Sequence, residues 1–168
     1  MSPEDKQNDF LQMLEAHRAM VHKVCHLYGH TPADRDDLFQ EISFQLWKAW
    51  PSFRGESRVG TWLYRIALNT AITGLRKKRD HVVLAGERMP DPADPGVDRE
   101  VEERRERMYE AIRALSEWER AVVMLYLEDK SYEEMEEILG VSQNNLRVRM
   151  TRIREKLRKQ TRSEGHGT

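Results

Sequence analysis

The sequence is poor in cysteine and in long apolar runs. Cys25 is the one cysteine among 168 residues. The chain can therefore close no internal disulfide and form no zinc knuckle, and we expect Cys25 to lie in a core. The longest apolar run, residues 121–127, is far shorter than the roughly 20 residues that span a bilayer. Residues 1–9 are acidic and polar, whereas a secretory signal needs a basic and then an apolar stretch. We therefore expect a cytoplasmic protein with no membrane insertion.

The motifs of the common enzyme classes are also missing. The sequence has no phosphate-binding loop, no G-x-G-x-x-G and no G-x-S-x-G. His22, His26 and His30 would share one face of a helix, but no carboxylate completes a metal site there. We expect a protein that is not an enzyme and that has no cofactor and no metal, with a metal on the histidine face kept open as an alternative.

Charge is abundant but unevenly distributed along the chain. Charged residues make up 34% of the sequence and the net charge is only -1. Residues 138–168 nevertheless hold eight basic and two acidic side chains, whereas residues 99–137 are strongly acidic. A local basic segment in a chain of near-neutral net charge is typical of a nucleic-acid-binding element. The alternative is a solvated helix tail that frays.

Proline and glycine are concentrated in residues 86–96, where Pro90, Pro92 and Pro95 alternate with aspartates. This composition predicts a flexible linker containing Pro and Asp over residues 81–98. On either side, apolar residues recur with the 3.6-residue period of a helix and never with the two-residue period of a strand. The sequence therefore predicts an all-α fold of two small helical domains, residues 1–80 and 99–168.

Apolar spacing and capping signals predict seven helices. They cover residues 8–29, 34–50, 58–80, 99–114, 117–128, 132–139 and 143–159. Thr31 and Pro32 supply a cap and a first-turn proline for the second helix. Ser116 with Glu119 and Ser131 with Glu134 form S-x-x-E capping boxes, and Ser142 can cap the last helix. Only residues 140–142 separate the last two helices, which predicts a helix-turn-helix in the C-terminal domain.

The last predicted helix carries the strongest signal for DNA binding. Leu146, Met150, Ile153 and Leu157 form one apolar stripe. The remaining surface presents amide, guanidinium, hydroxyl and small apolar groups, the chemistry that reads a major groove. The DNA-binding candidates are Asn144, Asn145, Arg147, Val148, Arg149, Thr151 and Arg152. The alternative is an ordinary basic amphipathic helix.

The helix at 34–50 carries an aromatic side chain on its polar side. Phe39, Ile42, Leu46 and Trp50 form its apolar face, and Phe44 projects from the other side. The side chains around Phe44 are those of Asp37, Gln40, Glu41 and Lys48. An aromatic anchor with a polar rim indicates a surface for a protein partner. The alternative is that another helix covers Phe44.

The helix at 58–80 combines aromatic, amide and basic groups. Trp62, Arg65, Asn69 and Arg76 fall within a band of about 60°, and the preceding turn offers Phe53 and Arg54. Such groups stack on unpaired bases and hold the backbone of a single strand, and Lys77 within the basic run 76–79 adds affinity for phosphate. The alternative is that Trp62 belongs to the core and the arginines face solvent.

Three stretches resemble the bacterial RNA polymerase sigma factors, specifically the extracytoplasmic-function (ECF) group. Residues 37–41 read D-L-F-Q-E and resemble the family's D-L-x-Q-E. Residues 53–55 and 61–69 read F-R-G and T-W-L-Y-R-I-A-L-N and resemble its signature in the region that melts and reads the minus-ten element. Residues 115–120, 131–140 and the basic last helix resemble the region that reads the minus-thirty-five element. The resemblance covers nearly the whole chain, and its parts stand in the family's order.

The resemblance implies an ECF-type sigma factor, which binds core RNA polymerase, recognises both promoter elements and directs initiation, including promoter melting. The residues implied to dock on the beta-prime clamp helices are Asp37, Leu38, Gln40 and Glu41, to which we add Phe44. Phe53, Arg54, Trp62 and Asn69 would hold a flipped base, with Arg65, Arg76 and Lys77 on the backbone. Arg147, Val148, Thr151 and Arg152 would meet the minus-thirty-five element, with Arg149 on a phosphate.

The resemblance also implies partners and a role for the linker. The expected partners are core RNA polymerase, including its beta flap, promoter DNA and an anti-sigma factor. The acids of residues 81–98 would mimic phosphates in the polymerase channel. Glu136 stands where the family usually has alanine, and Asn144, Asn145 and Leu146 stand where a G-T-V-type start is commoner.

Two other classes of protein remain open from the residues. A free-standing helix-turn-helix regulator would use the first domain for dimerisation or ligand binding and would bind duplex DNA without polymerase. A helical adaptor would instead present the basic helix to an acidic partner. The expected loss of DNA binding on replacing Arg152 separates the adaptor from the two DNA-binding classes.

Overall fold

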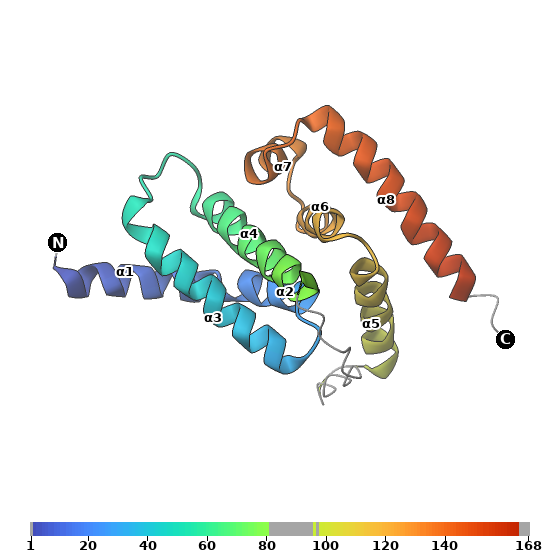
Figure 1. The fold of residues 1–168 in the computed structure, drawn as a ribbon, viewed down its shortest axis with the longest axis horizontal. Helices are drawn as coiled ribbons and strands as arrows, with labels where there is room; N and C mark the ends of the chain where they lie inside the picture. Colours follow the sequence, from blue (N-terminus) through green and yellow to red (C-terminus); the bar gives the residue numbers. More distant parts are fainter. Residues whose placement is uncertain (1, 81–95, 97, 165–168) are drawn as a thin grey trace. The chain divides into compact units, whose positions relative to one another are not determined.

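The computed structural model describes residues 2–80, 96 and 98–164, and the regular elements within these ranges are all helices (Figure 1). The chain divides into two compact units, residues 1–89 and 90–168. The prediction of an all-α fold with two helical domains is confirmed. The predicted linker at 81–98 lies, apart from residues 96 and 98, outside the described residues.

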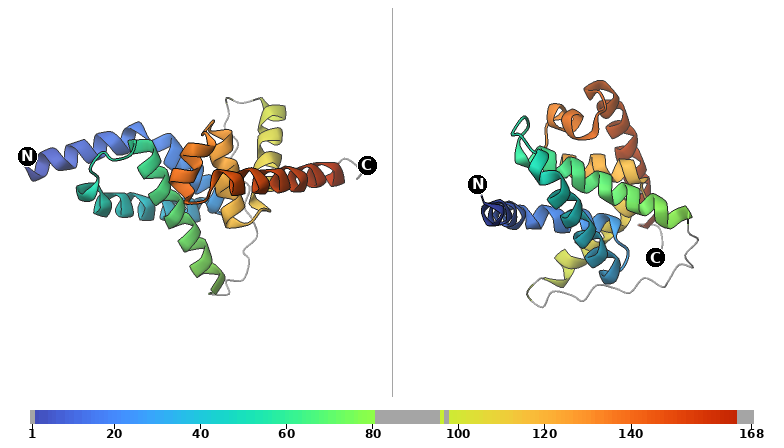
Figure 2. Two further views of the ribbon diagram at one scale, coloured as in Figure 1. Left: turned by 90° about the horizontal axis from the view of Figure 1, so that it is seen from above. Right: turned by 60° about the vertical axis from the view of Figure 1, so that its left-hand side comes forward.

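The first unit is a bundle of three helices with a fourth attached to it. Its elements are α1 (Pro3–Ala16), α2 (Arg18–Tyr28), α3 (Pro32–Ala49), the short 3-10 helix η1 (Trp50–Ser52) and α4 (Val59–Asp80). Helices α2, α3 and α4 pack on one another around Val24, Ile42, Leu46 and Leu63, which are fully buried. Helix α1 reaches outward from this bundle (Figure 1, Figure 2) and buries only Phe10 and Met13 among its own residues.

The prediction of one helix over 8–29 is wrong, because the chain forms two helices that meet at His17. The His17 ring Nδ1 lies 2.9 Å from the Met13 carbonyl oxygen, and the His17 N–H is shared between the carbonyls of Met13 and Leu14. This arrangement ends α1 at Ala16. The first helix also begins earlier than predicted. Ser2 and Asp5 form a capping box there, and the residue between them at the first helical position is Pro3.

The second unit contains the helix-turn-helix. Its helices are α5 (Arg99–Arg113), α6 (Glu117–Leu127), α7 (Tyr132–Leu139) and α8 (Gln143–Glu164). Both predicted capping boxes are confirmed, as is the cap of α8, where the Asn145 N–H donates to Ser142 Oγ over 3.3 Å. Helix α8 continues five residues past the predicted end at 159. Gly140 ends α7 with φ +69°, a left-handed conformation that glycine adopts without strain.

Cys25 is a core residue of the first unit, as predicted. Its side chain is 2% exposed, and burial raises the pKa of the thiol to about 12. Among the described helices, none is both long and apolar enough to cross a membrane.

Candidate functional site

Helix α8 presents a polar face and buries an apolar stripe, as its spacing predicts. Leu146, Met150 and Ile153 are buried, and Leu157 is half-buried. The side chains predicted to meet duplex DNA are all exposed: Asn144, Asn145, Arg147, Val148, Arg149, Thr151 and Arg152. Val148 is 54% exposed, which leaves its methyl groups accessible to a thymine methyl group.

Two arginines of α8 are held by the same arrangement, which sequence reasoning missed. Arg147 Nη1 donates to Asn144 Oδ1 over 3.2 Å, and its guanidinium lies 5.1 Å from the centroid of the Tyr132 ring. Arg149 Nε donates to Asn145 Oδ1 over 2.9 Å, and its guanidinium lies 4.3 Å from the Trp118 ring. Each arginine is therefore oriented by an asparagine of its own helix and by a ring of a preceding helix.

These contacts bear on what the two asparagines can offer to DNA. Asparagine reads adenine with its carbonyl oxygen and its amide nitrogen together. In Asn144 and Asn145 the oxygen already accepts a hydrogen bond from an arginine. The bonds orient Arg147 and Arg149, while each asparagine keeps both of its amide N–H donors and the second lone pair of its oxygen for a base edge.

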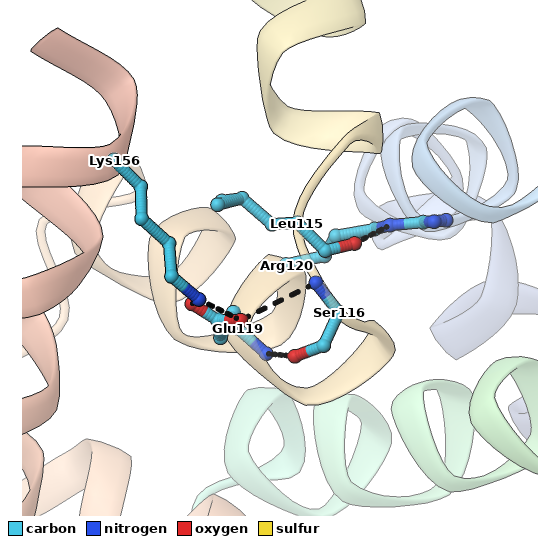
Figure 3. A network of polar contacts seen from close by, with 5 residues as sticks. All are labelled: Leu115, Ser116, Glu119, Arg120 and Lys156. Atoms are coloured by element: carbon cyan, nitrogen blue, oxygen red, sulfur yellow. Dashed lines mark hydrogen bonds and ion pairs between the residues drawn. The ribbon is translucent and has the colours of Figure 1, made fainter. Parts of the chain in front are cut away.

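A network of polar contacts fixes α8 against α6 (Figure 3). Lys156 Nζ donates to both carboxylate oxygens of Glu119 over 2.9 Å. Burial acts to raise the pKa of the Glu119 carboxyl, but hydrogen bonds from Lys156 and Ser116 outweigh it and hold the pKa below its usual value. The buried Arg120 donates through Nε to the Leu115 carbonyl oxygen over 3.1 Å. The Lys156–Glu119 contact thus ties α8 to the start of α6.

The predicted partner surface on α3 is exposed. Asp37, Gln40 and Glu41 are exposed, and Leu38 is half-buried. Phe44 is 54% exposed, so the packing of its own unit does not cover it, and the Lys48 ammonium lies 5.5 Å from its ring centroid. The ring therefore stands at the surface beside carboxylate and amide groups.

A hollow of about 250 Å³ joins this surface to two other helices. Asp37, Leu38 and Glu41 line it on the α3 side. The rest of the lining comes from Asp34 of α3, from the end of α2 and the residue after it, and from α4: Tyr28, Gly29, Thr70, Ala71, Gly74 and Leu75. Sequence reasoning found the α3 residues and missed those of α4, since no spacing along one helix relates them.

The candidates for single-strand binding lie along α4 and in the loop before it, and a cluster of rings stands at the start of α4. Phe53 and Trp62 are half-buried, with ring centroids 5.0 Å apart. The basic and amide candidates are exposed: Arg54, Arg65, Asn69, Arg76 and Lys77. Because α4 is unbroken from Val59 to Asp80, Trp62, Arg65, Asn69 and Arg76 share one of its faces. The rings stand at the start of this face, whereas Arg76 lies about 20 Å further along it, at a rise of about 1.5 Å per residue.

The second unit also has an apolar hollow that the sequence did not point to. It measures about 560 Å³ and lies between α5, α6 and α8. Met108 and Leu127, which line it, are 44% and 51% exposed, and Arg104 and Arg107 lie at the same hollow. Within the described ranges, no group of three or more His, Cys, Asp or Glu side chains could hold a metal ion.

Comparisons with known proteins identify both units. The family model Sigma-70 region 2 matches residues 13–81, and the model Sigma-70, region 4 matches residues 105–157. The chain is 31% identical to the ECF RNA polymerase sigma-E factor of Escherichia coli over 156 residues, which cover 80% of this chain and 78% of that protein. It is 36% identical over 103 residues to the ECF RNA polymerase sigma factor SigG of Mycobacterium tuberculosis, covering 61% of this chain but only 27% of SigG.

A solved structure shares the fold. The sigma factor RpoE of Bartonella quintana, in a co-crystal with the anti-sigma factor NepR, matches with a TM-score of 0.74 and 23% sequence identity. The match covers 92% of this chain and 97% of that one. The family models and the relative from Escherichia coli show that the chain belongs to the ECF RNA polymerase sigma factors, a family of non-enzymatic transcription initiation factors.

Proposed function

We propose that this chain joins core RNA polymerase, directs it to promoters with minus-ten and minus-thirty-five elements, helps to melt the duplex and is then released. The observation that carries the proposal is the presence of three chemically different surfaces on one short chain. These are the acidic and aromatic surface of α3, the ring cluster with the basic face of α4, and the basic face of α8. The proposal implies a protein that works in the cytoplasm, where bacterial transcription takes place.

The surface of α3 is the proposed site for the beta-prime clamp helices. The exposed Phe44 ring offers an apolar anchor, and Asp37 and Glu41 offer charges to a basic partner. Gln40 and Leu38 complete the surface, and the neighbouring hollow gives it a recess that a partner side chain can enter.

The ring cluster is the proposed site for the minus-ten element in its single-stranded form. An unpaired base can stack on Phe53 or Trp62, and Asn69 can hydrogen-bond to a base edge. Arg54, Arg65, Arg76 and Lys77 would hold the sugar–phosphate backbone. Capture of an unpaired base favours the melted promoter, because a duplex does not expose the face of its bases.

The exposed face of α8 is the proposed reader of the minus-thirty-five element. Arg147 and Arg152 can bond to guanine, and Val148 and Thr151 can meet thymine methyl groups. Arg149, held by Trp118, is directed to a phosphate.

Two further partners belong to the proposal. The apolar hollow between α5, α6 and α8 is the proposed site for the beta flap, since its exposed Met108 and Leu127 suit an apolar helix. An anti-sigma factor is the proposed regulator. The likeness to RpoE, which was crystallised with the anti-sigma factor NepR, supports this partner.

The experiment that tests the proposal is transcription from fragmented source DNA by bacterial core polymerase with the purified chain, followed by sequencing of the transcript starts. We expect starts that share two upstream motifs and that disappear with Asn69→Ala. Leu11→Ala, on the exposed side of α1, is the matched control and should leave them unchanged. Duplex binding by the chain alone, without polymerase-dependent starts, would overturn the proposal in favour of a free-standing regulator.

A further inference from the structure

Trp50 lies at the centre of the ring cluster, although its spacing marks it only as part of the apolar face of α3. Its ring stacks on Phe53 at 5.8 Å between centroids with an interplanar angle of 15°. It also meets Trp62 at 5.9 Å and Phe10 at 6.1 Å, with angles of 59° and 63°. Both rings proposed to receive an unpaired base therefore rest on the same third ring.

The backbone ties Trp50 to the loop as well. Trp50 ends α3 and opens η1, and the Phe53 N–H donates to its carbonyl oxygen over 3.1 Å. Ser52 Oγ donates to the Ala49 carbonyl oxygen over 2.8 Å. These bonds keep the first residues of the loop in a fixed turn, so the position of Trp50 sets that of Phe53.

Phe10 connects this cluster to α1. Phe10 is 5% exposed, whereas most other side chains of α1 are exposed. Its ring packs edge-on against Trp47, with the ring centroids 5.0 Å apart, and against Trp50. Its neighbour Leu11 is 51% exposed. Phe10 is therefore the aromatic side chain through which α1 contacts the end of α3.

We infer that Phe10 and Trp50 are positioning residues for the capture of an unpaired minus-ten base, with α1 holding Trp50 and Trp50 holding Phe53 and Trp62. The inference rests on the proposed function of that site. Stacking is favourable only if the receiving ring does not have to be ordered at the moment of binding, so a ring already held by its neighbours binds the base more tightly. In this arrangement α1 acts on promoter melting without touching DNA.

The test measures binding of a fluorescently labelled single-stranded oligonucleotide to the holoenzyme. The oligonucleotide carries the minus-ten sequence found upstream of the mapped transcript starts, with 2-aminopurine at the proposed flipped position. We expect Phe10→Leu and Trp50→Leu each to weaken binding by about 3- to 10-fold, the range expected from the loss of one aromatic contact. The quenching of 2-aminopurine by the rings should fall as well. Trp50→Phe, which keeps an aromatic ring, should restore binding to within about twofold.

Controls separate positioning from a general loss of stability. Leu11→Ala removes an exposed side chain next to Phe10, and Ile42→Val weakens the core of the same unit without changing a ring. Both should bind the oligonucleotide as the unchanged chain does. Affinity for core polymerase, measured in parallel, should be equal for all variants, because none of the changed residues belongs to the surface proposed for the clamp.

The outcomes distinguish failure of the positioning role from failure of the proposed minus-ten site. If Trp62→Ala and Asn69→Ala abolish oligonucleotide binding while Phe10→Leu and Trp50→Leu leave it intact, the positioning role is wrong and the proposed site stands. Equal weakening by Ile42→Val would also overturn it, because stability alone would then explain the effect. A chain that supports no promoter-dependent starts, or whose Trp62→Ala and Asn69→Ala variants bind normally, overturns both.

Discussion

The guanidinium of Arg149 lies 4.3 Å from the centroid of the Trp118 ring, and this contact joins α8 to the start of α6. A cation over a tryptophan face is stabilised by the ring's quadrupole, by about 0.5–1 kcal/mol at an exposed site. The hydrogen bond to Asn145 orients the same guanidinium from within α8. The guanidinium is thus held in one orientation in the free chain.

We expect Trp118→Leu to weaken binding of the minus-thirty-five duplex by about 2- to 5-fold, because Arg149 would have to be ordered on binding. Fluorescence anisotropy with a duplex from the mapped promoters measures this. In a double-mutant cycle with Arg149→Ala, the two changes should couple by about 0.5–1 kcal/mol. Strict additivity of the two losses would show that the ring does not act through Arg149.

The contact between Lys156 and Glu119 should make the stability of the second unit depend on pH. The folded-state pKa of Glu119 is lowered, so its contribution is present above the unfolded-state pKa of about 4.3 and is lost as the pH falls through the folded-state value. We expect Lys156→Gln to lower the free energy of unfolding by about 1 kcal/mol at pH 7 and by much less near pH 3.

Urea unfolding at the two pH values checks this prediction. Lys159→Gln, which removes a charge from an exposed position nearby on α8, is the control and should change stability little at either pH. An equal loss for Lys156→Gln at pH 7 and pH 3 would contradict the prediction, because the contribution of a carboxyl with a lowered folded-state pKa decreases once the pH falls below its unfolded-state pKa.

Charge reversal on α3 should weaken binding to core polymerase specifically. We expect Asp37→Arg and Glu41→Arg each to weaken binding to core polymerase by about tenfold or more, because like charges would face a basic partner. Asp36→Arg, an exposed position outside the lining of the hollow, should have a much smaller effect. Sedimentation or fluorescence with labelled core polymerase measures the affinities. Equal effects at Asp36 and Asp37 would indicate bulk charge rather than a docking surface.

Gly140 should resist substitution for conformational rather than steric reasons. Its φ is +69°, and a Cβ added there would meet no atom within 4 Å. We expect Gly140→Ala to lower the free energy of unfolding by about 1 kcal/mol and Gly140→Asn to cost less, since asparagine tolerates the left-handed region. Chemical denaturation of the two variants tests this order. An alanine variant as stable as the unchanged chain would contradict it.

Features set by neighbouring residues could be read from the sequence. The pairs Ser116–Glu119 and Ser131–Glu134 predicted the starts of α6 and α7, and the apolar stripe on α8 predicted its buried face. Features set between helices could not. The Lys156–Glu119 contact joins residues 37 positions apart. Nothing in the sequence indicates which arginine packs on the Trp118 ring, which the structure shows to be Arg149. The break at His17 was missed because a side-chain contact to the Met13 carbonyl leaves the apolar period unchanged.

The buried position of Cys25 decides how the chain behaves toward thiol reagents and oxidants. With a pKa of about 12, on the order of one thiol in 10⁵ is ionised at neutral pH, and the thiolate is the reactive form. A cysteine introduced at an exposed site such as Gln7 can therefore carry a fluorophore with little competition from the native thiol. For the same reason this thiol is a poor target for oxidants.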